Sequence, residues 1–193
     1  MTIQAANIGA MINHSNPVLG VAAAAWGLIG WSATLTFVIA RLSVYAIDAL
    51  ASELDPLQLA ALAANTGLLA WAEGYRGFQK RFSPRAAARI LYLRRHAGVL
   101  TATLAPLFCI GFFGVTPRIW RMTWIGTGLI LLAVIVVQQL PQPWRGIIDV
   151  GVVIGLAWGL VSFLAMSSRA LAQGRYPVPP GVPEPAGSRG AGL

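Results

Sequence analysis

The sequence predicts an all-α, multi-pass transmembrane helix bundle with four to five membrane-embedded helices and a short interfacial helix. Three observations support this class. Hydrophobic residues make up 56% of the 193-residue chain and charged residues only 10%, whereas a soluble domain carries about 25% charged residues. Several apolar runs reach the roughly 20 residues that cross a hydrocarbon core. The charged residues mostly flank these runs, as they do in membrane proteins.

We divide the chain into an N-terminal segment (1–17), a transmembrane bundle (18–170) and a disordered tail (171–193). The first apolar run begins near Val18 and continues to about residue 50. A helix of that length measures about 48 Å at 1.5 Å per residue, so we expect it to be tilted or to extend into the interface. In the acidic stretch SELDP that follows, Asp55 and Pro56 predict an N-cap and a first helical position.

The second helix is expected over 56–75 and is only weakly hydrophobic, because it contains Gln58 and Asn65. Such a helix is better surrounded by other helices than by lipid. A cytoplasmic basic loop over 76–96 follows, in which Ser83 and Pro84 predict the start of the short interfacial helix. Its arginines recur at helical spacing and are expected to face lipid headgroups. The predicted lipid-facing basic residues are Arg76, Lys80, Arg81, Arg85, Arg89, Arg94 and Arg95.

The segment 97–116, which contains APLFCIGFFGVTP, permits two interpretations. Its length and apolarity favour a fifth spanning helix, and we lean to that arrangement. Pro106, Gly111 and Gly114 can also break the helix, so that the segment enters the membrane and returns to the same side. Two further spans are expected over 120–140 and 146–166, joined by the stiff connection PQPWR. The tail is rich in proline and glycine, which predicts disorder.

Positive charge in short loops stays on the cytoplasmic side, so the basic loop and the N-terminus are predicted to be cytoplasmic. If 97–116 spans, Lys and Arg number 8 inside and 6 outside; if it returns, they number 12 inside and 2 outside. The charge bias therefore favours the returning segment, in disagreement with its length. The side of the C-terminus stays open at this point.

Few residues of the chain are candidates for a functional site. Gly151, Gly155 and Gly159 form a flat helix face that another helix can approach closely, either within the chain or across an interface. Glu73 and Asp149 are the candidate membrane acids, with structural pairing as the main interpretation and ion or proton handling as the alternative. The single Cys109 excludes an internal disulfide, and we predict no catalytic residues, cofactor or metal site.

Two stretches, EGYRGFQKRFSPRAAAR (73–89) and LPQPWRGIIDVGVVIGLAWG (140–159), resemble a family of small uncharacterised bacterial integral membrane proteins. The resemblance implies a location in the bacterial inner membrane and carries no mechanism. From the residues we expect a non-enzymatic helix-packing or assembly module that contacts anionic lipid headgroups and associates with itself or with a membrane complex, without binding nucleic acid. The alternative is a small transporter or channel component that uses Glu73, Asp149 and a broken segment at 97–116.

Overall fold

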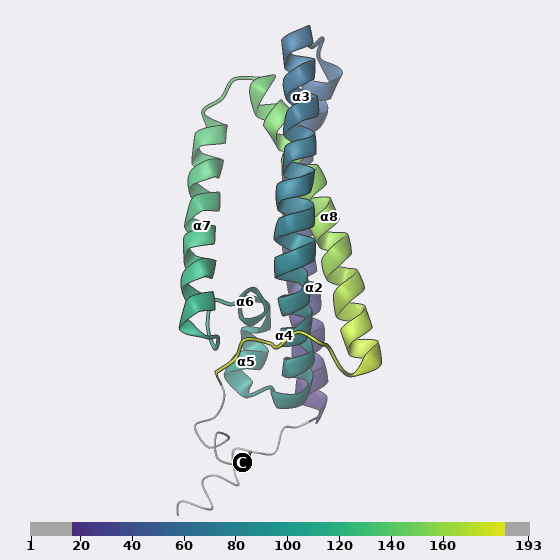
Figure 1. Cartoon of the computed structure of the whole chain (residues 1–193), viewed down its shortest axis with the longest axis vertical. Helices are drawn as coiled ribbons and strands as arrows, with labels where there is room; N and C mark the ends of the chain where they lie inside the picture. The colour runs from purple at the N-terminus through teal and green to yellow at the C-terminus, as the bar shows by residue number, and fades with distance from the viewer. Residues whose placement is uncertain (1–16, 184–193) are drawn as a thin grey trace, which may run out of the picture.

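The computed structural model describes residues 17–183, which form helices and connecting turns without any strand (Figure 1). Residues 1–16 of the expected N-terminal segment and residues 184–193 of the tail lie outside the described residues, while Pro17 begins the first helix. Three described helices are long and apolar enough to cross a membrane: α2 (Pro17–Ala51), α7 (Pro117–Gln138) and α8 (Trp144–Gln173). The predicted all-α bundle is confirmed, while four to five spanning helices are not.

A fourth rod consists of three helical segments that continue into one another: α3 (Pro56–Leu69), the π-helical η1 (Ala70–Phe82) and α4 (Ser83–His96). The rod begins with a capping box, in which the Asp55 side chain accepts from the Gln58 N–H at 2.8 Å and the Gln58 side chain accepts from the Asp55 N–H at 3.0 Å. The N-cap predicted at Asp55 is thus confirmed.

Helix α4 begins at Ser83 with Pro84 in its first turn, as predicted, but Ser83 does not cap it, and η1 continues into it without a break. The predicted loop over 76–96 is therefore helical. Ser83 has right-handed helical backbone angles, and its N–H donates to the Phe78 carbonyl, five residues back. This wider hydrogen-bond register precedes Pro84, which has no N–H to contribute to the helix. The rod continues because α4 packs between α2 and α8 and buries one face there, including Ala86, Ile90 and Leu93.

The four long elements alternate in direction along the bundle (Figure 1). Helix α2 and α7 run one way, and the rod and α8 run the other, so the connections 52–55 and 139–143 lie at the same end. We call this the acidic end, because Asp48, Glu53 and Asp55 are near it. The opposite, basic end carries the last turn of α4, the first turn of α7 and the last turn of α8. Its cations are Arg94, Arg95, Arg118, Arg121, Arg169 and Arg175.

The segment 97–116 begins and ends at the basic end and does not span the bundle (Figure 1). It forms two short helices, α5 (Val99–Thr103) and α6 (Ala105–Ile110), followed by bends. Gly111 and Gly114 have φ of 102° and 65°, backbone conformations that glycine adopts at little cost and other residues rarely do. Of the two interpretations of this segment, the structure contains the returning one, and the expected fifth spanning helix is wrong.

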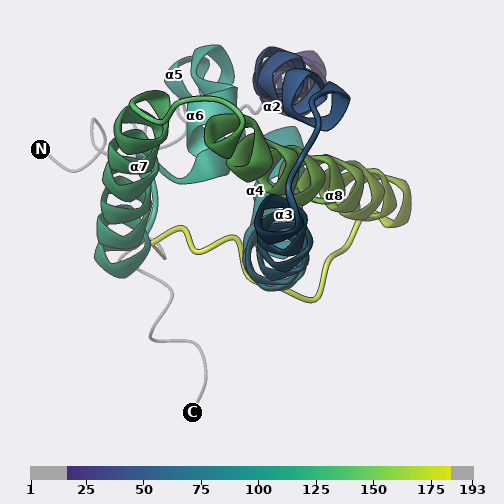
Figure 2. The same ribbon diagram turned by 90° about the horizontal axis from the view of Figure 1, so that it is seen from above.

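Helix α7 stands apart from the other long elements when the bundle is seen from above (Figure 2). None of its residues is buried, whereas α2 and α8 bury several residues each. The main hydrophobic core lies toward the basic end, between α2, α4, α6 and α8. Its buried members are Ala23, Ala24, Ala86, Ile90, Leu93, Ala97, Ala105, Phe108, Cys109 and Phe163.

The tail begins later than predicted, and residues 174–183 have a defined path. Helix α8 continues to Gln173, beyond the predicted boundary at 170, and residues 174–183 then cross the basic end toward α7 (Figure 1). The Thr116 N–H donates to the Gly181 carbonyl at 2.9 Å, and Val182 packs against the core. We call residues 174–183 the strap, because they connect the end of α8 to the start of α7.

Candidate functional site

The glycine face of α8 is covered by the rod of the same chain. Gly151, Gly155 and Gly159 are all buried. A Cβ on Gly151 would collide with Asn65 and one on Gly159 would lie 2.5 Å from Phe78, while one on Gly155 would lie 3.3 Å from the Glu73 Cβ. Of the two interpretations of this face, internal packing is therefore the one present in the structure. The face is not free for a second copy.

Two other glycines, which were not predicted as packing residues, make closer approaches to backbone atoms. A Cβ on Gly20 would collide with the Arg94 carbonyl, and a Cβ on Gly146 with the Tyr45 carbonyl and the Ala49 side chain. Gly20 and Ala24 are four residues apart, as are Ala23 and Gly27, and all four are buried. This small-residue spacing in α2 is the signal that could have located the contact between α2 and α4.

Asp149 lies in a polar cluster at the acidic end of α8. Its side chain is buried, and its Oδ2 lies 3.8 Å from the Arg145 Nε, one helical turn earlier. The Arg145 guanidinium sits 3.6 Å from the ring centre of Tyr45 on α2. The Asn65 side chain donates to the Ile147 carbonyl at 2.8 Å and thereby attaches α3 to the same turn of α8. These contacts give Asp149 a structural partner on its own helix.

Glu73 lies apart from Asp149 in the structure. It lies against Gly155, six residues further along α8 than Asp149, a separation of about 9 Å along a helix axis. The Glu73 carboxylate has no hydrogen bond or ion pair with any residue of 17–183. Within that range, no three His, Cys, Asp or Glu side chains are grouped so as to hold a metal ion.

The basic residues of the rod separate into two groups. Six of the seven are exposed: Arg76, Lys80, Arg81, Arg85, Arg94 and Arg95. Arg76 lies 4.9 Å from the ring centre of Trp71 and Lys80 lies 5.2 Å from that of Tyr75, so aromatic rings hold these cations along the outer side of the rod. None of these six cations forms an ion pair with a residue of 17–183.

Arg89 does not face lipid, in contrast to its prediction. Its side chain is 2% exposed. Its Nη1 donates to the Cys109 carbonyl at the end of α6 at 2.9 Å, and its Nε donates to the Pro180 carbonyl of the strap at 3.0 Å. A cation is favoured at a helix C-terminus, where carbonyl groups lack helical partners. Arg89 therefore joins α4, α6 and the strap in one buried contact, which we call the Arg89 clamp.

The strap has additional arginine contacts. Arg94 donates to the Leu171 carbonyl at 2.9 Å, and Arg95 donates to the Gly174 carbonyl. Three arginines of α4 thus fix the last turn of α8 and the strap through carbonyl groups rather than through carboxylates. Arg94 and Arg95 remain exposed, so each combines a structural contact with a position at the surface of the basic end.

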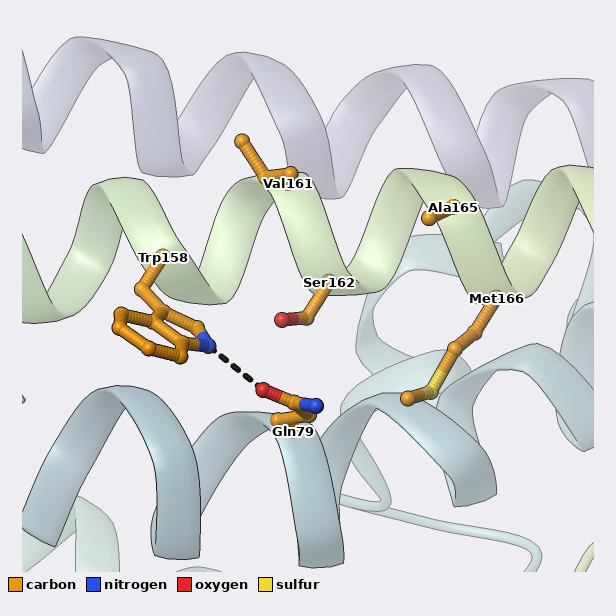
Figure 3. A pocket seen from close by; sticks show the side chains of 6 residues that line it. All are labelled: Gln79, Trp158, Val161, Ser162, Ala165 and Met166. Atoms are coloured by element: carbon orange, nitrogen blue, oxygen red, sulfur yellow. Dashed lines mark hydrogen bonds between the residues drawn. The ribbon is translucent and has the colours of Figure 1, made fainter. Parts of the chain in front are cut away.

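A groove of about 410 Å³ lies between η1 and the middle of α8 (Figure 3). The Gln79 side chain projects into it from η1, and its Oε1 accepts from the Trp158 Nε1 at 2.7 Å. The remaining wall is formed by side chains of α8: Val161, Ser162, Ala165 and Met166. Ser162 is buried, while Trp158 and Val161 are 44% and 67% exposed. The groove therefore opens sideways, away from the bundle, and no pattern in the sequence indicated it.

The chain was compared with protein-family models, with curated proteins and with solved structures, and none of the three comparisons finds a match. The resemblance of 73–89 and 140–159 to a bacterial membrane-protein family stays a prediction. The features of residues 17–183 that bear on function are the arrangement of charge, the glycine contacts and the groove.

Proposed function

We propose that the chain is a non-enzymatic integral membrane protein that crosses a bacterial inner membrane four times and binds anionic phospholipid headgroups at its basic end. The four crossings would be α2, the rod from its α3 end, α7 and α8. The basic end, and with it both termini, would be cytoplasmic. Anionic lipid is concentrated enough in such leaflets to attract clustered Lys and Arg.

The observation that supports this proposal is the separation of charge between the two ends. Every acidic residue of 17–183 lies at the acidic end or within the bundle. The basic end holds six arginines, and none of them forms an ion pair with a residue in the described part of the chain. Such an end meets the positive-inside rule and leaves its charges available to phosphate groups. Arg41 and Arg145 are the exceptions near the acidic end, and the remaining exposed cations lie along the rod between the two ends: Arg76, Lys80, Arg81 and Arg85.

Self-association does not use the face formed by Gly151, Gly155 and Gly159, because the rod of the same chain occupies it. Association with a second copy or a membrane complex would need another surface. Helix α7, which buries none of its residues, has the most apolar surface without a protein neighbour. That surface is also the one expected to face lipid.

Topology reporters test the orientation. A reporter active only in the cytoplasm, fused after residue 183, should be active, as should one placed at the N-terminus. A periplasm-specific reporter inserted between Ser52 and Leu54, or after Leu140, should be active as well. A periplasmic C-terminus beside a cytoplasmic N-terminus would contradict four crossings.

A small transporter or channel component is the second candidate, and one observation favours it. Glu73 presents an unpaired carboxylate to α8 from within a π-helical stretch, and such stretches are frequent at functional sites. In this case Glu73→Gln should abolish proton or cation flux into proteoliposomes. Asp149→Asn should reduce this flux less, because the Asp149 carboxylate is already paired with Arg145. Equal flux in Glu73→Gln and the unmodified protein would eliminate this candidate.

A further inference from the structure

The groove between η1 and α8 has the shape and lining of a site for an extended apolar chain. Its volume of about 410 Å³ lies within the range of small-ligand pockets, roughly 300–1,000 Å³. The hydrogen-bonding atoms of the Trp158 indole and the Gln79 carbonyl are occupied with each other. Most of the wall that remains is aromatic, aliphatic or thioether (Figure 3), and the flexible Met166 can adapt to an occupant.

The direction in which the groove opens determines which molecules can enter it. Trp158 and Val161 border it and are exposed on the outer side of α8. Helix α8 is long and apolar enough to span a membrane, so in the proposed orientation this side faces the bilayer rather than water. The molecules available there are lipids. The exposed Lys80 and Arg81 next to Gln79 place this level near the cytoplasmic boundary of the hydrocarbon core, where the acyl chain of a lipid begins below its headgroup.

A cation lies beyond the groove on the same face of α8. Arg169 follows Ala165 by four residues and Met166 by three, positions that share one face of a helix. Its side chain is exposed and forms no ion pair with any residue of 17–183. Arg169 is also on the basic-end side of the groove. An arginine so placed can form charge-assisted hydrogen bonds with a phosphate group.

We propose that one anionic phospholipid of the cytoplasmic leaflet binds at this position, with an acyl chain in the groove between η1 and α8 and its phosphate on Arg169. This proposal rests on the proposed function and refines it, because it assigns one discrete site in addition to the diffuse attraction of the basic end. The apolar chain accounts for the lining, and the charge of the headgroup complements the unpaired guanidinium.

Native mass spectrometry of the full chain in a mild detergent tests this site. The protein is titrated with phosphatidylglycerol or with phosphatidylcholine of the same acyl chains, and the first bound lipid is counted. We expect one phosphatidylglycerol to bind before any phosphatidylcholine does. Ala165→Trp, which fills the groove, should raise the phosphatidylglycerol concentration for half occupancy at least about tenfold, and Arg169→Gln should do so for phosphatidylglycerol alone.

Control variants separate loss of the groove from a general effect of an added tryptophan or from misfolding. Ala133→Trp places the same side chain on the exposed surface of α7 and should leave the first bound lipid unchanged. Val161→Trp alters the exposed border of the groove and replaces Ala165→Trp if the latter does not fold. Glycerol phosphate, which has the headgroup charge without the chain, should not displace the lipid.

The possible failures are distinguishable. If the unmodified protein prefers phosphatidylglycerol but Ala165→Trp, Val161→Trp and Arg169→Gln do not change the first bound lipid, the groove site is wrong and the proposed function stands. Displacement by glycerol phosphate would likewise overturn the chain-binding site. If the unmodified protein binds both lipids equally, the proposed function itself is contradicted.

Discussion

Replacing Gly146 with alanine should lower the free energy of unfolding by about 1–3 kcal/mol, the usual effect of overpacking a closely packed contact. The added methyl group would collide with the Tyr45 carbonyl on α2 and with the Ala49 side chain. A backbone carbonyl within a helix cannot move aside as a flexible side chain can, so the two helices must separate. Reversible unfolding in mixed micelles containing increasing SDS, followed by circular dichroism, measures the change.

Gly128→Ala on α7 is the matched control, because a Cβ at that position meets nothing within 4 Å. In a helix this substitution ordinarily stabilises by about 0.5–1 kcal/mol, so the two glycine variants should move in opposite directions. Gly20→Ala, whose methyl group would meet the Arg94 carbonyl, should behave like Gly146→Ala. Equal stability of Gly146→Ala and Gly128→Ala would show that α2 and α8 do not approach as closely as described.

Replacing Arg89 with alanine should release the strap and open the packing around α6. The substitution removes donors to the buried Cys109 carbonyl and to the partly buried Pro180 carbonyl. A buried acceptor left without a partner costs about 1–3 kcal/mol. Cys109 is an internal reporter of this change. It is 0% exposed, and burial raises the pKa of its thiol to about 12, so a maleimide should not label it at pH 7.5 in the folded protein.

In Arg89→Ala, the rate of Cys109 labelling should rise at least about tenfold, in line with the loss of a buried hydrogen bond. Limited proteolysis should also cut between residues 174 and 183 earlier than in the unmodified protein. Arg85→Ala is the control, since Arg85 is exposed and belongs to the same helix. If Cys109 labels slowly in both variants and the strap resists protease, the Arg89 clamp does not hold these segments together.

The long apolar helices are the part of the fold that local sequence determines most directly. The first was expected from Val18 to about 50 and runs over Pro17–Ala51, and the run expected over 120–140 forms α7 over Pro117–Gln138. An apolar run defines such a helix by itself, because a helix satisfies all its backbone hydrogen bonds within one segment. The spacing of Gly151, Gly155 and Gly159 indicates a close approach by another helix, but it does not indicate which one.

The rod and the Arg89 clamp could not be predicted from local hydropathy and capping patterns. Ser83–Pro84 has the form of a helix start, yet contacts with α2 and α8 continue the helix through it, since tertiary packing overrides a local capping preference. Arg89 shares its spacing with exposed arginines, and its partners, Cys109 and Pro180, lie 20 and 91 residues away. No periodic pattern contains that information. For the segment 97–116, the distribution of Lys and Arg between the two sides predicted the observed return to the same end. The length of its apolar run predicted a spanning helix instead.

The order in which the rod and α8 are synthesised has a consequence for biogenesis. A translocon retains a nascent segment according to its hydropathy. The crossing part of the rod is only weakly hydrophobic, because it holds Gln58, Asn65 and Glu73, while α8, whose glycines receive it, begins only at Trp144. Stable insertion of the rod therefore depends on a helix that the ribosome has not yet made. A ribosome stalled before α8 should hold a chain whose second crossing is incomplete.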